Sequence, residues 1–138
     1  MQLSAIFNPA NYQWSYWSIP PLIASLYFFA LGAFILFNNI RSRINISFFL
    51  VCINSFVWLF SYALCFSQST YEGGLFWSRN AYFGINYIAV SMYFYTVELL
   101  DLRKQRKWVY IFYALMIAFT PVTRTNYFLA GVVKWPWG

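Results

Sequence analysis

The stretch INISFFLVCINSFVWLFSYALCF, residues 44–66, contains no charged side chain. A helix needs about 20 predominantly apolar residues, within a range of roughly 17–25, to cross the hydrocarbon core of a bilayer. The stretch has that length, and its residues do not show the strict alternation that a strand of a membrane barrel requires. It therefore predicts a transmembrane helix.

Three further apolar runs lie on either side of this one. Together the four predict helices at about 18–38, 44–66, 80–100 and 108–122. The third run contains one charge, Glu98, and the fourth is the shortest and carries Pro121 near its end. We expect an all-α membrane protein in which four transmembrane helices form an antiparallel bundle over residues 18–123.

The composition supports lipid as the solvent for most of the chain. Of its 138 residues, 62% are hydrophobic and 9% are charged, whereas ordinary globular proteins have roughly 45–50% and about 25%. A soluble domain of this size could not bury so much apolar surface. The lipid bilayer is therefore the first predicted partner.

The two ends of the chain are expected outside the cytoplasm. Residues 1–17 contain no Lys or Arg, which excludes the positive region of a cleaved signal peptide. Pro20 and Pro21 suit the first turn of a helix, where a missing N–H costs little. Residues 1–17 thus predict an extracytoplasmic leader, and 124–138 an extracytoplasmic tail. Aromatic residues of the leader are expected at the level of the lipid headgroups: Tyr12, Trp14, Tyr16 and Trp17.

Basic residues are concentrated in two of the predicted turns. The segment LRKQRKW, residues 102–108, holds four cations, and the turn after the first helix holds two more. The opposite side has three: Arg79, Arg124 and Lys134. Because cytoplasmic loops carry an excess of Lys and Arg, we expect both turns in the cytoplasm and the N-terminus outside. A turn this short has no room for a folded basic surface that could bind nucleic acid, so nucleic acid is not a predicted partner. The six topology anchors are Arg41, Arg43, Arg103, Lys104, Arg106 and Lys107.

No catalytic constellation is visible in the sequence. The chain has no His and three acidic residues, and it lacks the usual nucleophile–base, nucleotide and metal signatures. We predict no catalytic residue, no metal site and no cofactor. Glu98 and Asp101 are interpreted as part of a solvated interfacial ion cluster. Cys52 and Cys65, 13 residues apart on one helix, would be roughly 20 Å apart and could not form a disulfide.

A few polar residues in the apolar runs are candidates for ligand binding. Asn54 and Asn86 are expected to point into the bundle, either as interhelical hydrogen-bond partners or as the lining of a ligand cavity. Arg79, above Tyr82, is either an interfacial cation or a group that captures an anionic or aromatic ligand. Gly73 and Gly74 are interpreted as a turn, and no GxxxG motif indicates a packing seam. The candidate ligand-binding residues are Arg79, Tyr82, Asn86 and Asn54.

The chain also resembles a known family. The segments IPPLIASLYFFALGAFIL, NNIRSRINISFFL, FVWLFSYAL and FWSRNAYFGI are similar to the first four helices of the N-terminal seven-transmembrane sensor region of bacterial histidine kinases, which is also found ahead of diguanylate cyclases. The tail KWPWG resembles the start of that family's next extracellular stretch. The resemblance implies a signal-input domain in the bacterial inner membrane and an output module that this chain does not contain. It also implies a homodimer. The four helices would then be part of a seven-helix domain, so the chain is interpreted as a truncated form, a fragment or a stand-alone four-helix relative.

Two alternatives belong to other functional classes. A small carrier or channel subunit would need polar residues continuous along one face of the bundle, and here they are sparse. A structural four-helix membrane subunit has no distinguishing sequence feature.

Overall fold

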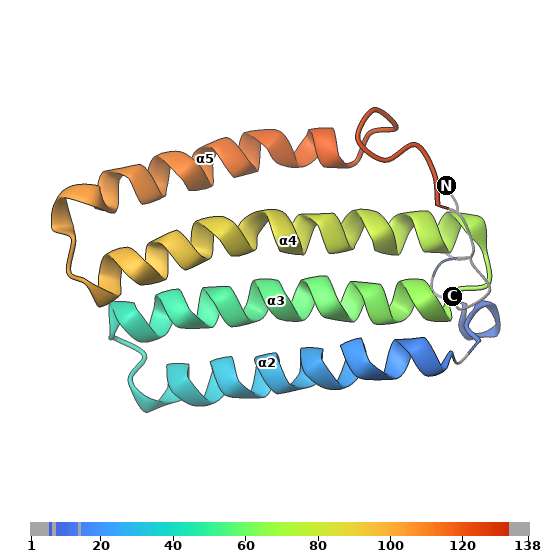
Figure 1. The fold of residues 1–138 in the computed structure, drawn as a ribbon, viewed down its shortest axis with the longest axis horizontal. Helices are drawn as coiled ribbons and strands as arrows, with labels where there is room; N and C mark the ends of the chain where they lie inside the picture. Colours follow the sequence, from blue (N-terminus) through green and yellow to red (C-terminus); the bar gives the residue numbers. More distant parts are fainter. Residues whose placement is uncertain (1–5, 7, 14, 133–138) are drawn as a thin grey trace.

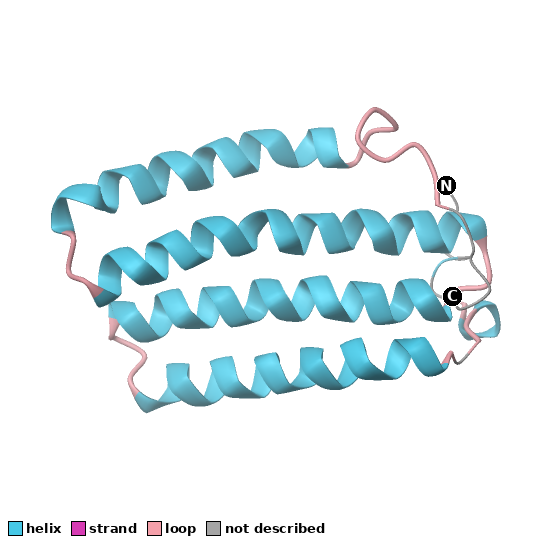
Figure 2. Cartoon of the chain, viewed as in Figure 1, coloured by secondary structure: helices cyan, strands magenta, loops and turns pink. Residues whose placement is uncertain are grey.

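Helices make up almost all of the regular structure. The computed structural model describes residues 6, 8–13 and 15–132. Its long helices are α2 (Ile19–Asn38), α3 (Arg43–Ser67), α4 (Tyr71–Leu99) and α5 (Arg106–Thr123). Single turns of 3-10 helix are η1 (Pro9–Asn11), η2 (Tyr16–Ser18) and η3 (Arg103–Gln105). The described residues contain no strand beyond one isolated bridge (Figure 2). The predicted all-α class is confirmed.

The four long helices lie side by side in chain order and alternate in direction (Figure 1). Each packs chiefly against its neighbour in sequence, with α3 against both α2 and α4, and α5 against α4. The short turns make each helix the antiparallel neighbour of the one before it. The result is an open layer with α2 and α5 at its edges. That the four helices form a transmembrane bundle stays a prediction.

Two segments of the described chain are long and apolar enough to cross a membrane, residues 16–38 and 43–67. They correspond to α2 and α3. By the same criterion α4 and α5 do not pass, because α4 carries several polar residues along its length and α5 begins with Arg106 and Lys107. The membrane-spanning role of the last two helices therefore stays a prediction.

Side-chain caps fix where α3 and α4 begin. Ser42 Oγ accepts a hydrogen bond from the Asn45 amide at 3.4 Å, and Thr70 Oγ1 accepts one from the Gly73 amide at 3.3 Å. Both caps satisfy an amide that a helix start leaves unpaired. Glu72 lies in the first turn of α4, where a negative charge is favourable.

The start of α4 differs from the sequence prediction. The helix begins at Tyr71, not near position 80, and the turn expected at Gly73 and Gly74 is wrong because both glycines are helical. Gly73 lies directly under the Gln68 side chain, where a Cβ would collide with it. A glycine here lets the preceding turn fold down onto the helix.

The chain reverses after α4 at Asp101, whose φ of 46° is left-handed. Asp is one of the few residues besides Gly that adopt this conformation readily. The amide of Leu102 then bonds to the Val97 carbonyl at 2.9 Å, which closes the end of the helix. This turn returns η3 and α5 toward α4.

Two glycines allow close contact between helices. A Cβ on Gly84 would lie 2.6 Å from the Trp58 amide nitrogen and 2.9 Å from the Asn54 carbonyl oxygen, so α4 approaches the backbone of α3 directly. A Cβ on Gly32 would lie 2.6 Å from Cys52 Cβ, where α2 meets α3. Small residues at membrane helix contacts permit such approaches. These helix contacts depend on single glycines, so a search for the GxxxG motif does not find them.

Candidate functional site

A buried ion pair joins the end of α4 to the start of α5. Arg106 Nε donates to Glu98 Oε1 at 2.9 Å, and Arg106 Nη2 donates to Glu98 Oε2 at 2.8 Å. The Glu98 side chain is 3% exposed and that of Arg106 is 28% exposed. The expectation of a solvated cluster is thus wrong for Glu98, because α5 folds back over it and supplies a guanidinium of matching geometry.

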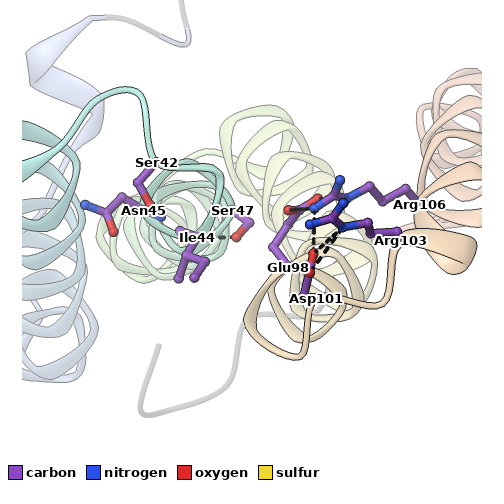
Figure 3. Close-up of polar contacts among 8 residues, drawn as sticks. All are labelled: Ser42, Ile44, Asn45, Ser47, Glu98, Asp101, Arg103 and Arg106. Atoms are coloured by element: carbon purple, nitrogen blue, oxygen red, sulfur yellow. Dashed lines mark hydrogen bonds and ion pairs between the residues drawn. The ribbon is translucent and has the colours of Figure 1, made fainter.

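The outer part of this cluster is exposed to solvent. Asp101 accepts a hydrogen bond from Arg103 at 3.2 Å and a second, longer one from Arg106 at 3.3 Å (Figure 3). The hydrogen bond to Asp101, followed by its negative charge, raises the pKa of Arg103. Figure 3 also shows Ser42 and Asn45 at the start of α3. The cluster therefore lies at the same end of the layer as the turn between α2 and α3.

The six basic residues assigned as topology anchors lie in the two turns at this end, which Figure 1 shows, or in the first residues of the helices that follow them. Five are exposed: Arg41, Arg43, Arg103, Lys104 and Lys107. Lys107 Nζ lies 5.9 Å from the centroid of the Trp108 ring, within the range of a cation–π contact. Arg106 has a second role as the partner of Glu98.

A chain of polar side chains crosses the layer at the middle of α4. Asn54 Nδ2 of α3 donates to Ser91 Oγ at 2.8 Å, and Ser91 Oγ lies 2.8 Å from the Tyr113 hydroxyl of α5. Ser91 is fully buried. Nearby, the hydroxyls of Tyr87 and Thr120 lie 2.9 Å apart and make a further link between α4 and α5.

The four candidate ligand-binding residues are not gathered at one place: among the described residues, no contact joins them to one another. Asn54 belongs to the hydrogen-bonded series with Ser91 and Tyr113. Tyr82 lies edge-on to Phe128 at 5.1 Å between ring centroids. Asn86 is half-buried and makes no hydrogen bond within the described part of the protein. Their role in binding stays a prediction.

Arg79 connects α4 to the segment after α5. Its Nη2 donates to Asn126 Oδ1 at 2.7 Å and to the Leu129 carbonyl at 2.9 Å, while its buried Nε has no hydrogen-bond partner among the described residues. Arg124 Nη2 donates in the opposite direction to Asn80 Oδ1 at 2.7 Å. Partial burial, followed by the charge of Arg79, lowers the pKa of Arg124. The two arginines thus hold this end of α5 against α4 through neutral acceptors.

A cavity of about 660 Å³ lies at the same end of the layer, beside α2 and α3. Tyr12 and Gln13 contribute to it from the leader, Leu22 from α2, Phe60 and Ala63 from α3, and Trp77 from α4. None of the four candidate residues lines it. Sequence reasoning missed this cavity because its lining brings together the leader and three helices.

The leader is attached to the turn between α3 and α4. The Gln13 amide donates to the Ser67 carbonyl at 2.7 Å, and the Ser69 amide donates to the Asn11 carbonyl at 2.9 Å. Trp77 Nε1 donates to the Tyr12 hydroxyl at 2.9 Å. Tyr16 and Trp17, expected at the headgroup level, are both exposed. Trp14, Lys134 and the segment KWPWG lie outside the described residues.

Within the described residues there is no group of three or more His, Cys, Asp or Glu side chains that could hold a metal ion. Both cysteines are free thiols. Cys52 is buried, and Cys65 Sγ lies 3.2 Å from Ser78 Oγ at the contact between α3 and α4. The two thiols are not joined to each other, as their spacing predicted.

These features define a helical membrane protein with its charged and polar contacts at the helix ends and along α4. The chain matches, over residues 20–135, the family described as the N-terminal 7TM region of histidine kinase, and it belongs to that family. Comparison with curated proteins and with solved structures gives no match. The resemblance noted from the sequence is confirmed. The family description names seven helices, and the described residues contain the four long helices α2 to α5.

Proposed function

We propose that this chain is the membrane-embedded signal-input region of a bacterial signal-transduction protein such as a histidine kinase. It passes an extracellular or in-membrane stimulus to a cytoplasmic output module. The observation that carries the proposal is the family match, which spans residues 20–135. The chain itself performs no catalysis in this proposal, and the output module carries the enzymatic activity.

The proposed setting is the bacterial inner membrane, with all four helices spanning it as the first four of a seven-helix domain and with the N-terminus outside. Support comes from the charge distribution, since both turns at one end of the layer are basic and short cytoplasmic loops favour Lys and Arg. Family membership also supports a homodimer, because kinase output modules commonly work in pairs.

The contact between α4 and α5 offers a mechanism. Helix α5 packs less extensively against α4 than α3 does, and separate polar contacts join α4 to α5, or to the segment after α5, at successive levels. From the leader end they are Arg79 with Asn126, Tyr87 with Thr120, Ser91 with Tyr113, and Glu98 with Arg106. A stimulus that favours one packing of α5 by differential contacts would move the basic turn at the far end.

The place where the stimulus binds is a separate part of the proposal. Arg79, Tyr82, Asn86 and Asn54 are the candidate ligand-binding residues. Three of them already contact other side chains or backbone groups of α4, α5 or the segment after α5. A ligand that exchanged these contacts would act directly on the α4–α5 interface.

The decisive experiment is to read the gene beyond the codon for Gly138 and to assay its product. We expect the gene to continue into, or to lie beside, a histidine kinase or diguanylate cyclase module, and we expect membranes containing the protein to show that activity. A stop codon directly after this region, with no kinase or cyclase gene adjacent, would contradict the proposal.

A further inference from the structure

The cavity beside α2 and α3 has an apolar interior. Its walls include Leu22, Phe60, Ala63 and Leu64, and none of the described residues that line it is charged. Its volume of about 660 Å³ falls in the range of roughly 300–1,000 Å³ that is typical of sites for small molecules.

The hydroxyl donors along this wall are already used within the protein. The Tyr12 hydroxyl donates to the Ile6 carbonyl at 2.9 Å and accepts from Trp77. Ser18 Oγ donates to the Ser15 carbonyl at 2.6 Å, and Ser67 Oγ donates to the Ala63 carbonyl at 3.0 Å. A buried water needs two to four polar partners, so this interior favours an apolar occupant.

Gln13 supplies the polar part of the cavity. Its side chain is exposed and makes no hydrogen bond within the described residues, although its backbone amide is bonded to Ser67. A free amide can both donate and accept a hydrogen bond. The arrangement matches a molecule with one uncharged polar group and an apolar body.

The depth of the cavity argues against the acyl chain of a phospholipid. The lining of α3 extends from Ser67, the last residue of the helix, back to Phe60, which is about 10 Å at 1.5 Å per residue. An acyl chain covers half of the hydrocarbon core, about 15 Å. A compact molecule fits this depth better.

The leader forms part of the cavity wall and is held by contacts that can be broken locally. Tyr12 pairs with Gln68 in an isolated bridge, and Trp77 contacts both the cavity and the Tyr12 hydroxyl. An occupant would therefore touch α2, α3, α4 and the leader together. Such a position allows binding to change how α3 and α4 pack near the Gly84 contact.

We infer that this cavity binds a small uncharged amphiphile, with its apolar body against Leu22, Phe60 and Ala63 and its polar group at Gln13. That the bound molecule is a signal rests on the proposed function, whereas the binding itself does not. The two are tested separately, because binding is measured on this chain without any output module.

The test uses the purified chain in nanodiscs of unbrominated phosphatidylcholine, titrated with bromohexanol, a compact alcohol whose bromine quenches tryptophan fluorescence on contact. We expect a saturable component of quenching. Ala63→Leu and Leu22→Phe, which fill the cavity from two helices, should weaken the apparent affinity by about tenfold or more, equivalent to about 1.4 kcal/mol. Gln13→Ala, at an exposed side chain, should weaken it several-fold without affecting folding.

Two controls make the result specific. Ala30→Leu adds the same volume at an exposed position on α2 and should leave the saturable component unchanged, and bromohexanoate, the charged analogue, should show none. Saturable quenching that survives all three cavity variants would overturn the inference. A second result would also overturn it. If dibromo-phosphatidylcholine in the nanodisc quenches the tryptophans and the cavity-filling variants reduce that quenching, the occupant is a bilayer lipid.

Discussion

Arg106, at the start of α5, holds Glu98, at the end of α4, through two parallel hydrogen bonds of 2.9 and 2.8 Å. The Glu98 side chain is 3% exposed, so removing its partner would leave a buried carboxylate without a counter-ion. Breaking a buried pair typically costs about 3–5 kcal/mol. We expect Arg106→Gln to lower the free energy of unfolding by about 3 kcal/mol, the lower end of that range, because Arg106 is partly exposed.

The matched control for this change is Arg103→Gln. The Arg103 side chain is 78% exposed and pairs with Asp101, which is also exposed. Exposed pairs contribute little to stability because solvent screens them, so this variant should unfold almost as the unmodified protein does. Titration with a denaturing detergent measures both variants, and equal losses of stability would contradict the structural difference between the two pairs.

Gly84 is predicted to tolerate no side chain at the crossing of α3 and α4. A Cβ there would lie 2.6 Å from the Trp58 backbone nitrogen, and backbone cannot move aside as a flexible side chain can. Overpacking of this kind typically costs about 1–3 kcal/mol, and we expect Gly84→Ala to lose stability in that range. At Gly74 a Cβ would meet only Val132 Cγ2 at 3.5 Å, so Gly74→Ala should be neutral or slightly stabilising. The same unfolding assay compares the two, and a neutral Gly84→Ala would show that the helices are farther apart.

The ranges of α2, α3 and α5 and the positions of the two basic turns followed from the sequence, because long uncharged runs and clustered basic residues are local signals. The start of α4 did not follow from the sequence, since Gly73 and Gly74 suggested a turn. The signal that could have located this helix start was Thr70 as a cap, followed by Glu72 in the first turn. The ion pair of Glu98 and the cavity depend on contacts between distant segments. No periodicity in the sequence indicates that the leader folds back against Gln68 or that the four helices form an open layer.

The leader should loosen when the Tyr12 hydroxyl is removed. Tyr12→Phe deletes both the hydrogen bond to Ile6 and the one from Trp77. We expect backbone amides of residues 8–13 to exchange with deuterium several-fold faster, since a net hydrogen bond contributes about 0.5–1.5 kcal/mol. Tyr16→Phe changes the same group on a side chain that is 90% exposed and should leave this exchange unchanged. Equal protection in both variants would mean that the hydroxyl does not hold the leader.

The proposed orientation predicts which turns are reachable from outside the cell. In a background with Cys52 and Cys65 replaced by Ala, Glu72→Cys should react with a membrane-impermeant maleimide on intact cells. Gln105→Cys, in the basic turn between α4 and α5, should react only after the membrane is permeabilised. Both positions are exposed, so access to solvent within the protein does not distinguish them. Labelling of position 105 on intact cells would reverse the proposed topology.

The central claim is that this region passes a stimulus to an output module through the packing of α3, α4 and α5. The most direct measurement is the output activity, in membranes, of the full-length protein that carries this region, compared between Ser91→Ala and Thr96→Ala. Ser91 joins Asn54 to Tyr113 across three helices. Thr96 is exposed, and within the described residues its hydroxyl bonds only to the Met92 carbonyl of its own helix. Each lost interhelical bond should shift the balance between packings by about 0.6–1.7 kcal/mol. We predict a several-fold change in output activity for Ser91→Ala and none for Thr96→Ala; unchanged activity in both variants, at equal protein levels, would contradict the account.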